Sequence, residues 1–445
     1  MSFAVFLKNN LKNISPGLGK FINKIPYSIR PGLGSVYSNR LTEINLIKNY
    51  DQEQKQEFIF SRIKKLTKTA YSNIPFYKGH YDKEGFHPGD LKSFDDLKKI
   101  PIISKRNLQE WELEQRSSPT KGRYIVNTGG SSGSPFSLYI EPSSMGHEWA
   151  HIHTIWGKFN YKPSDLKLVF GGRSDLKDVI EYDVVRNHFA IDIYADYTIV
   201  AIKLKQLLKK YEIKYLHGYP SSIYDFAIYC DNEDVELKEL LSKNLKGAFL
   251  GSEYPHKHYR EAIESVFDIP TISWYGHTER AILAFEKNEQ FTYEPFLSYG
   301  FSEALSLGED NYNLIATSYY NNASPLIRYN TEDIITDVVE NGGILESFKI
   351  TKGREGEFVT DKIGKKINLT GLIFGRHHEL FNYSKFIQVK QIKQGVIEIH
   401  FVSETKSENQ AAELFDRQNL NFDIKFIKNK EPHRTQAGKI NLLIK

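Results

Sequence analysis

The stretch NTGGSSGSP, residues 127–135, combines three glycines with four hydroxyl side chains, residue types that can bind a phosphate group. Small residues leave backbone N–H groups uncovered and hydroxyls add donors, so such a loop can surround an anion. It is not a Walker P-loop, because neither a G-K-[ST] sequence nor a helix pattern follows. Instead, FSLYIEP alternates as a strand does, which predicts a strand–loop–strand hairpin. A phosphate loop without a lysine needs positive charge from elsewhere, and Lys439 near the C-terminus is a candidate.

The same stretch has a second interpretation, as the nucleophile elbow of a serine hydrolase. Residues 129–133 satisfy the pattern G-x-S-x-G with Ser131 as nucleophile, and Asp333 and His433 follow in the chain order of the α/β-hydrolases. That elbow requires a helix directly after the serine, whereas Pro135 and a strand pattern follow here. The serine hydrolase therefore stands as the alternative to phosphate binding.

Four short apolar segments in the middle of the chain predict a parallel sheet. Each is typical of a buried strand that runs into glycine and polar residues: 166–172, 213–220, 246–253 and 271–279. Helical patterns accompany them, at 197–211, 221–230 and 256–267. Strands that alternate with helices are typical of parallel sheets, whose ligands bind outside the carboxyl ends of the strands. The glycines at those ends are predicted to meet at one edge: Gly171, Gly218, Gly251 and Gly276.

The flanking segments predict further elements and a second domain. Apolar residues at helical spacing predict a helix over 51–71. After residue 300 the composition favours strands again, at 313–320, 325–338 and 344–350. A segment rich in glycine and charge then precedes a region of strand-like alternation. We therefore expect a large domain over 1–352 and a small α+β domain over 353–445.

Composition excludes several classes of protein. The net charge of +4, with acids interspersed among the bases, does not favour nucleic-acid binding. Cys230 is the only cysteine, which excludes an internal disulfide and a thiolate zinc cluster and fits a reducing, cytoplasmic compartment. No apolar run approaches the roughly 18 residues of a membrane span, so we expect no stable membrane insertion. The apolar residues of the first eleven positions predict a short helix that docks on the protein body or lies at a membrane surface.

Five motifs together carry a resemblance to a known family. YIVNTGGSSGSP, WYGHTE, PLIRYNTED, KGRE and RTQAGKI occur in the order and approximate spacing of the adenylate-forming (ANL) superfamily. The chain resembles in particular the phenylacetate–CoA ligase-like proteins, including their capsule-biosynthesis branch, from about residue 60 to the end. The resemblance implies an α/β fold in which a large N-terminal domain, with parallel-rich sheets and crossover helices, carries a small mobile C-terminal α+β domain.

The activity that the resemblance implies has two steps. A carboxylate attacks the α-phosphate of ATP, with Mg²⁺ as cofactor, to give an acyl-adenylate and pyrophosphate. A thiol such as coenzyme A, or an amine as in capsule polysaccharide biosynthesis, then displaces AMP. A homodimer is compatible with such a family. Three classes of function remain open: the adenylating ligase, the serine hydrolase, and a nucleotide-binding protein that has lost catalysis.

The resemblance also assigns roles around the nucleotide. The β- and γ-phosphates would contact the hairpin loop: Thr128, Gly129, Gly130, Ser131, Ser132, Gly133 and Ser134. Thr278 is similar to the residue that binds the α-phosphate, and Glu279 to the magnesium ligand, where one carboxylate plus phosphate oxygens and waters suits the ion. Tyr275 would lie against the adenine, whose other side is similar to a three-residue segment: Gly251, Ser252 and Glu253. Lys439 would bridge the carboxylate and the α-phosphate in the first step.

The remaining assignments concern the ribose and the acyl group. Asp333 matches the acid that binds the ribose hydroxyls, and Arg354 resembles a linker arginine that reaches ribose or phosphate. The chain departs from the family pattern at three positions: Ser134 where lysine is frequent, Glu332 where glycine is usual, and Gly356 where an acidic hinge residue is usual. The acyl pocket is predicted at two loops: Tyr219, Pro220, Ser221, Gly276 and His277.

Overall fold

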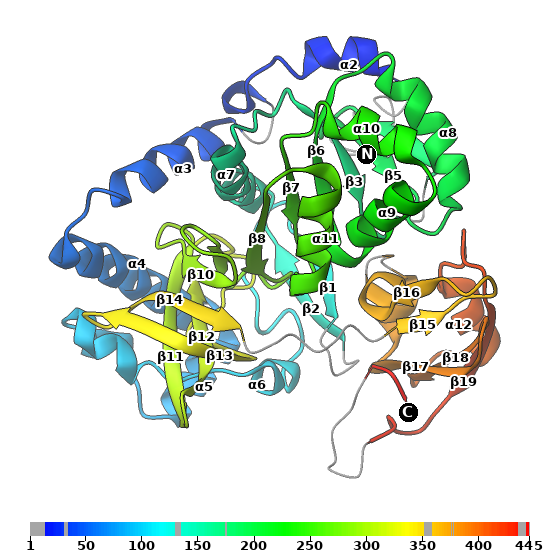
Figure 1. Cartoon of the computed structure of the whole chain (residues 1–445). Coiled ribbons are helices and arrows are strands. Elements are labelled where there is room, and N and C mark those ends of the chain that lie inside the picture. Colours follow the sequence, from blue (N-terminus) through cyan, green and yellow to red (C-terminus); the bar gives the residue numbers. More distant parts are fainter. Residues whose placement is uncertain are drawn as a thin grey trace.

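The computed structural model describes residues 14–30, 34–129, 135–173, 176–350, 358–374, 376, 378–434 and 442–444 (Figure 1). Within these ranges, no helix combines the length and apolar character needed to cross a membrane. The first helices run along the outer rim of the molecule: α2 (Pro16–Ile22), η1 (Tyr27–Ile29), α3 (Gly34–Ile47), α4 (Gln52–Asn73) and α5 (Pro75–Lys83). Short helices follow at η2 (Pro88–Asp90), η3 (Phe94–Lys99) and α6 (Lys105–Gln109).

Twelve strands of the described chain form one mixed sheet. Their order across the sheet is β11-β12-β13-β14-β10-β9-β8-β7-β6-β3-β5-β4. The four predicted strands are neighbours in it and run parallel: β3 (Leu166–Phe170), β6 (Ile213–Gly218), β7 (Gly247–Leu250) and β8 (Thr271–Gly276). The expected crossover helices are present: α8 (Tyr197–Leu208), α9 (Pro220–Asn232) and α11 (Lys257–Phe267). The prediction of a parallel α/β core is confirmed.

Apart from β5, which pairs parallel with β3, the other strands of this sheet pair antiparallel, which the expectation of parallel-rich sheets did not include. They include β9 (Leu283–Phe285), β10 (Thr292–Pro295), β11 (Gly300–Gly308), β12 (Asn311–Ser318), β13 (Tyr329–Asn341) and β14 (Ile344–Ile350). Tight turns connect several of them, and between β13 and β14 both Gly342 and Gly343 adopt positive φ, a conformation that favours glycine. At the opposite edge, β4 (Ile180–Asp183) pairs antiparallel with β5 (His188–Ile191).

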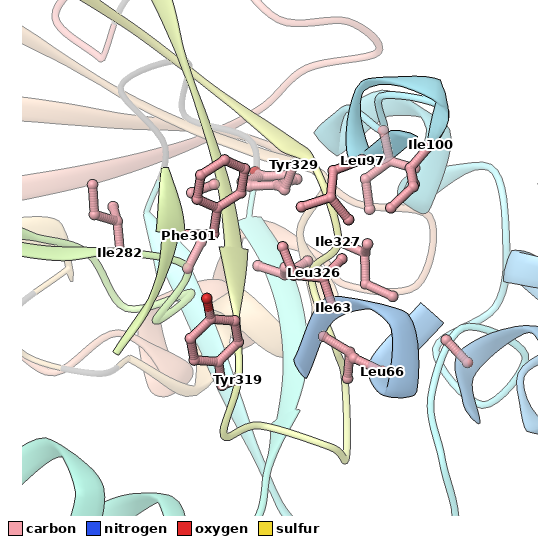
Figure 2. Close-up of a cluster of buried hydrophobic side chains, with 14 of the residues drawn as sticks. Ile63, Leu66, Leu97, Ile100, Ile282, Phe301, Tyr319, Leu326, Ile327 and Tyr329 are labelled. Atoms are coloured by element: carbon pink, nitrogen blue, oxygen red, sulfur yellow. The ribbon is translucent and has the colours of Figure 1, made fainter. Parts of the chain in front are cut away.

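The predicted helix over 51–71 is confirmed as α4. Asp51 caps its start, since the Asp51 carboxylate accepts the backbone N–H of Gln54 at 2.9 Å in a capping box. One face of α4 is buried against the antiparallel strands, where Ile63 and Leu66 lie beside Ile327 (Figure 2). This cluster forms the core beneath the antiparallel half, and a separate cluster between the parallel strands and α8, α9 and α11 forms the core of the other half.

A hairpin and three further helices belong to the large unit. The hairpin joins β1 (Tyr124–Gly129) to β2 (Pro135–Ile140) in antiparallel register, with Gly129 opposite Pro135. The helices are α7 (Ser144–Trp156), η4 (Gly157–Phe159) and α10 (Val235–Ser242), with α6 lying close to β13. The two predicted strands on either side of residues 130–134 are therefore confirmed.

The C-terminal unit has its own sheet and its own buried cluster. Strands β17 (Phe386–Lys393), β18 (Val396–Val402) and β19 (Asp423–Lys428) form the sheet, and α12 (Glu408–Leu414) packs on it. The strand pair β15 (Phe358–Thr360) and β16 (Lys366–Asn368) and the helices η5 (Thr370–Phe374) and η6 (Glu379–Tyr383) complete the unit. The predicted boundary between residues 352 and 353 falls outside the described residues, so this division into domains stays a prediction.

One buried ion pair ties the central strands together. The guanidinium of Arg260 on α11 donates to both carboxylate oxygens of Glu286, at 3.0 and 2.7 Å, and the two side chains are 1% and 3% exposed. The Glu286 carboxylate also accepts the backbone N–H of Ser273 on β8 at 2.7 Å and that of Phe291 at 2.6 Å. These four hydrogen bonds offset the free-energy cost of burying the Glu286 carboxylate.

We expect Glu286→Ala to lower the free energy of unfolding by about 3–5 kcal/mol, because it leaves the Arg260 charge buried without its partner. Urea unfolding at neutral pH measures the change. The matched control is Glu261→Ala, which breaks an exposed pair with Lys257 on the same helix and should cost less than about 1 kcal/mol. Equal losses in the two variants would contradict a special role for the buried pair.

Candidate active site

The carboxyl ends of the parallel strands meet at one edge, as the glycine positions predicted. The N–H of Gly251 donates to the carbonyl of Gly218 at 3.1 Å, and the N–H of Tyr219 to that of Phe170 at 2.9 Å. Gly218 adopts a φ of +145°, and a Cβ there would lie 2.1 Å from the Phe170 carbonyl oxygen. A Cβ at Gly251 would lie 2.6 Å from the Trp274 ring. Glycine at both positions lets the strand ends and their loops approach closely.

The predicted adenine and ribose residues touch each other. Tyr275, at the end of β8, donates its hydroxyl proton to Oδ2 of Asp333 on β13 at 2.5 Å. Burial, followed by the Asp333 charge, raises the pKa of Tyr275 well above its ordinary value, so the phenol stays a donor. Glu332 beside Asp333 adopts a positive φ of +64°, the conformation that makes glycine usual at this position of the family pattern.

A second group of charges lies just beyond β8. Nδ1 of His277 lies 3.3 Å from Oε2 of Glu279. Burial alone would lower the pKa of His277, but the hydrogen-bonding Glu279 carboxylate, with the charges of Asp333 and Glu148, outweighs it and raises that pKa. The edge of the sheet thus concentrates negative charge, so a polyphosphate could bind there only together with cations.

Lys105 supplies one such cation, and sequence reasoning missed it. Ser104 caps α6 through its hydroxyl, which accepts the N–H of Asn107 at 3.2 Å, and Ile103 pairs with Tyr329 of β13. The first residue of α6 is therefore fixed beside the site. Burial lowers the pKa of Lys105, while the charges of Glu279 and Glu332 oppose that shift. No motif marked this lysine, because its neighbours lie more than 170 positions away in the chain.

The predicted adenine segment and the predicted acyl pocket are joined by Glu253. Its carboxylate accepts the hydroxyl proton of Ser221 at 2.7 Å and the Ser221 N–H at 3.3 Å. Burial raises the pKa of Glu253 to about 7 even though the Ser221 donors lower it. Oε1 of Glu253 is buried with no hydrogen-bond partner among the described residues, and Ser252 before it adopts a φ of +69°.

Two cavities flank these residues. The first lies between the turn after β6 and the C-terminal unit, where Tyr219 and Ser221 share its wall with Asp225, Lys365 and Gly371. The second includes Arg280, the residue after Glu279, in its wall, and only polar and aromatic side chains line it: Ser144, His147, Glu148, Arg280, Tyr299, Ser318, Tyr320 and Asn321. The acyl-pocket prediction contained residues of the first cavity and none of the second.

Several predicted residues lie outside the described ranges. These are Gly130, Ser131, Ser132, Gly133, Ser134, Arg354 and Lys439, together with Gly356. Thr128 and Gly129 end β1, and Asn127 beside them donates to Oδ1 of Asn382 in the C-terminal unit at 3.0 Å. The hairpin and the C-terminal unit are thus in contact, next to the strand edge (Figure 1).

The described residues do not assemble the alternative hydrolase. A strand rather than a helix follows the loop, as β2 begins at Pro135. Asp333 accepts from Tyr275, while Nε2 of His433 lies 3.2 Å from Nδ1 of His400 inside the C-terminal unit. The described ranges also contain no group of three or more His, Cys, Asp or Glu side chains arranged to hold a metal ion. An ion at Glu279 would need most of its ligands from substrate oxygens and water, which suits magnesium.

The sequence is similar to curated proteins of the predicted kind. It is 24% identical to Protein CapK of Staphylococcus aureus over 304 residues, which cover 66% of this chain and 64% of that protein. It is also 24% identical to the phenylacetate-coenzyme A ligase of Escherichia coli (strain K12) over 323 residues, which cover 66% of this chain and 69% of the ligase. The chain thus spans just under two thirds of CapK. No protein-family profile matches the chain.

The fold is similar to that of solved acyl-CoA ligases. A 2-hydroxyisobutyryl-CoA ligase in complex with 2-HIB-AMP and CoA matches with a TM-score of 0.56 at 15% identity, over 88% of this chain and 90% of that one. The same ligase in a postadenylation state matches with a TM-score of 0.52. The chain therefore has the fold of the adenylate-forming superfamily, and its predicted resemblance to that superfamily is confirmed. Within the superfamily, the similarity in sequence is to CapK and the phenylacetate–CoA ligases.

The raised pKa of Glu253 predicts a pH-dependent stability. Between its ordinary pKa of 4.5 and about 7, the folded chain holds a proton that the unfolded chain has released, so this group's stabilisation is lost as the pH rises through 7. Glu253→Gln should therefore be more stable than the parent at pH 8, by about 1–3 kcal/mol, with the difference shrinking towards pH 5. Urea unfolding at both pH values measures it. The exposed control Glu261→Gln should show the same free energy of unfolding as the parent at both pH values. If Glu253→Gln also matches the parent at both, the raised pKa of Glu253 is contradicted.

Proposed function

We propose that the protein activates a carboxylic acid with ATP, forming an acyl-adenylate, and then transfers the acyl group to an acceptor. The observation that carries this proposal is the Tyr275–Asp333 hydrogen bond at the strand edge. It presents an aromatic ring and a carboxylate side by side, which are groups suited to a base and to ribose hydroxyls. Glu279 follows β8 at the carboxyl end of the parallel strands, where ligands of such sheets bind.

The first step is an exchange at the α-phosphorus of ATP. A carboxylate oxygen of the acid forms a bond to this phosphorus, the bond to the bridging oxygen of the β-phosphate breaks, and pyrophosphate leaves. The proposed roles follow from the negative charge that develops on the phosphate oxygens during this step. Thr278 binds the α-phosphate, the hairpin loop of residues 128–134 holds the β- and γ-phosphates, and Lys439 bridges the carboxylate and the α-phosphate. A magnesium ion, when bound with Glu279, would neutralise phosphate charge.

The second step replaces AMP by an acceptor. A thiol sulfur or an amine nitrogen attacks the acyl carbon, AMP leaves, and the acceptor loses a proton. Coenzyme A would be the acceptor if the likeness to the phenylacetate–CoA ligases extends to this step, and an amine would be the acceptor in a capsule polysaccharide role. The cavity between Tyr219 and Lys365 lies at the contact between the large unit and the C-terminal unit, and we propose that the acceptor enters at this contact when the two units separate.

Lys105 completes the proposed phosphate site. Acids dominate the edge of the sheet, and the hairpin loop contains no lysine, so the triphosphate requires a further cation. Lys105 lies close enough to Glu279 and Glu332 for both charges to act on its pKa. We assign it to the phosphates of ATP.

The first experiment is a hydroxylamine-trapping assay with ATP, magnesium and a panel of aryl, aliphatic, amino and sugar acids. We expect pyrophosphate and a hydroxamate with one class of acid, and a loss of at least about 100-fold in Lys439→Ala, because the charge at the reacting phosphorus is no longer balanced. Lys425→Ala, an exposed lysine of the same unit, is the matched control. Absence of ATP binding would overturn the proposal, and a fluorophosphonate adduct on Ser131 would favour the hydrolase.

Substitution of Lys105 tests the proposed phosphate site without knowledge of the carboxylic acid substrate. We expect Lys105→Met to weaken ATP binding, measured by calorimetry without any acid, by about 10-fold or more, because one cation beside the phosphates is lost. Arg106→Met removes an exposed cation from the next position of α6 and should leave binding within about twofold. If both variants bind ATP as the parent does, Lys105 has no place in the phosphate site.

A further inference from the structure

The N-terminal segment differs in charge from the rest of the chain. Residues 1–42 contain six of the 59 Lys and Arg residues and no Asp or Glu. The remaining 403 residues therefore carry 53 basic and 55 acidic side chains, a net charge of −2, against +6 for the segment. The bases and acids of the chain are thus interspersed everywhere except at this end.

The same segment exposes large apolar side chains. Leu18, Phe21, Ile25 and Ile29 are 55%, 67%, 45% and 69% exposed. They recur every three or four positions across α2 and η1, and we call them the N-terminal apolar face. Isolated exposed apolar residues are ordinary, but four within twelve positions form a candidate interaction surface.

On its other side, this segment packs against the rest of the protein. A Cβ at Gly19 would lie 2.2 Å from the Tyr182 hydroxyl oxygen, so the helix packs directly on that ring. Nδ2 of Asn23 donates to the Val184 carbonyl at 2.8 Å, and the Tyr27 ring packs against His153 at 4.7 Å. These inward contacts hold α2 on the outer rim of the molecule (Figure 1). The exposed fractions of the apolar face show that its side chains are not covered by these contacts.

Charge distinguishes between the partners that could cover this face. An interface with a second copy would bring two segments of +6 together, which is repulsive in a two-fold contact. An anionic lipid surface offers the opposite charge to the bases and an apolar layer to the side chains between them. Lys24 is exposed beside the Phe21 ring, at 5.5 Å from its centroid, so base and aromatic ring are presented together.

We propose that the N-terminal apolar face docks on the surface of an anionic membrane, without crossing it. The apolar side chains enter the boundary between headgroups and acyl chains, and the exposed Lys24 beside them binds an anionic headgroup. This assignment is independent of the adenylation proposal, because none of its residues lines the candidate active site.

The test is co-sedimentation of the full chain with vesicles. We expect binding to phosphatidylglycerol–phosphatidylcholine vesicles, much weaker binding to phosphatidylcholine alone, and weakening by salt. Phe21→Asp combined with Ile29→Asp, and separately Lys24→Glu, should each reduce partitioning by about 10-fold or more. The matched control Val235→Asp introduces one such negative charge at a side chain that is 53% exposed on α10, and should bind within about twofold of the parent.

Three outcomes would overturn the proposal: no binding to either vesicle, equal binding to both, or binding that the face variants leave unchanged. Gel filtration accompanies the assay, and a dimer that dissociates only in the Phe21→Asp/Ile29→Asp variant would instead assign the face to a second copy. Thermal melting of each variant separates loss of binding from loss of folding. The adenylation assay, run without vesicles, reports on the proposed function separately.

Discussion

The buried pair of Arg260 and Glu286 is the constraint on which the arrangement of the candidate site depends. A carboxylate inside an apolar core is tolerated only with its donors in place, and here those donors come from α11, β8 and the segment before β10. The pair therefore sets where β8 lies relative to its neighbours. The end of β8 and the residues after it include Tyr275, His277, Thr278 and Glu279. Their positions therefore depend on the contact between Ser273 of β8 and Glu286.

Negative charge is concentrated at the strand edge. Glu279, Glu332 and Asp333 gather there, and the charge of Asp333 acts on both the Tyr275 hydroxyl and the His277 ring. Such a concentration of acids repels a polyphosphate unless cations accompany it. In the proposed mechanism, Lys105 on α6, a metal ion and Lys439 would together supply these cations. The neutral hairpin loop can contribute N–H and hydroxyl donors, but no net charge.

The C-terminal unit is anchored to the large unit by specific contacts. Nζ of Lys365 donates to the carbonyls of Ile193 and Ala195, at 2.5 and 3.2 Å, and lies 4.4 Å from the centroid of the Tyr197 ring. Burial lowers the pKa of Lys365, with the charges of Asp225 and Asp192 opposing the shift. Any rotation of the unit between the two proposed steps would have to break these contacts. The buried residues of the hydrophobic cluster around β17 and β18 all belong to the C-terminal unit, which therefore has a core of its own.

The sequence by itself determined the elements whose pattern is local. Residues 166–170 and 213–218 form strands because short apolar runs end at glycine, and α4 forms because Asp51 caps a segment with one apolar face. The hairpin over 124–140 could likewise be predicted from strand alternation around a loop of small residues. The meeting of Gly218 and Gly251 at one edge followed from the rule that neighbouring parallel strands end on the same side of a sheet.

Tertiary structure alone decided what depends on partners distant in the chain. The antiparallel half of the sheet extends further than the composition after residue 300 indicated, because its hairpins pair through contacts that no single segment encodes. Lys105 had no motif around it, and its importance comes from lying beside Glu279 and Glu332. The raised pKa of Glu253 likewise comes from burial beside Ser221. A local pattern predicts which element a residue joins, whereas burial, charge and hydrogen bonding at a site are set by residues that folding brings together.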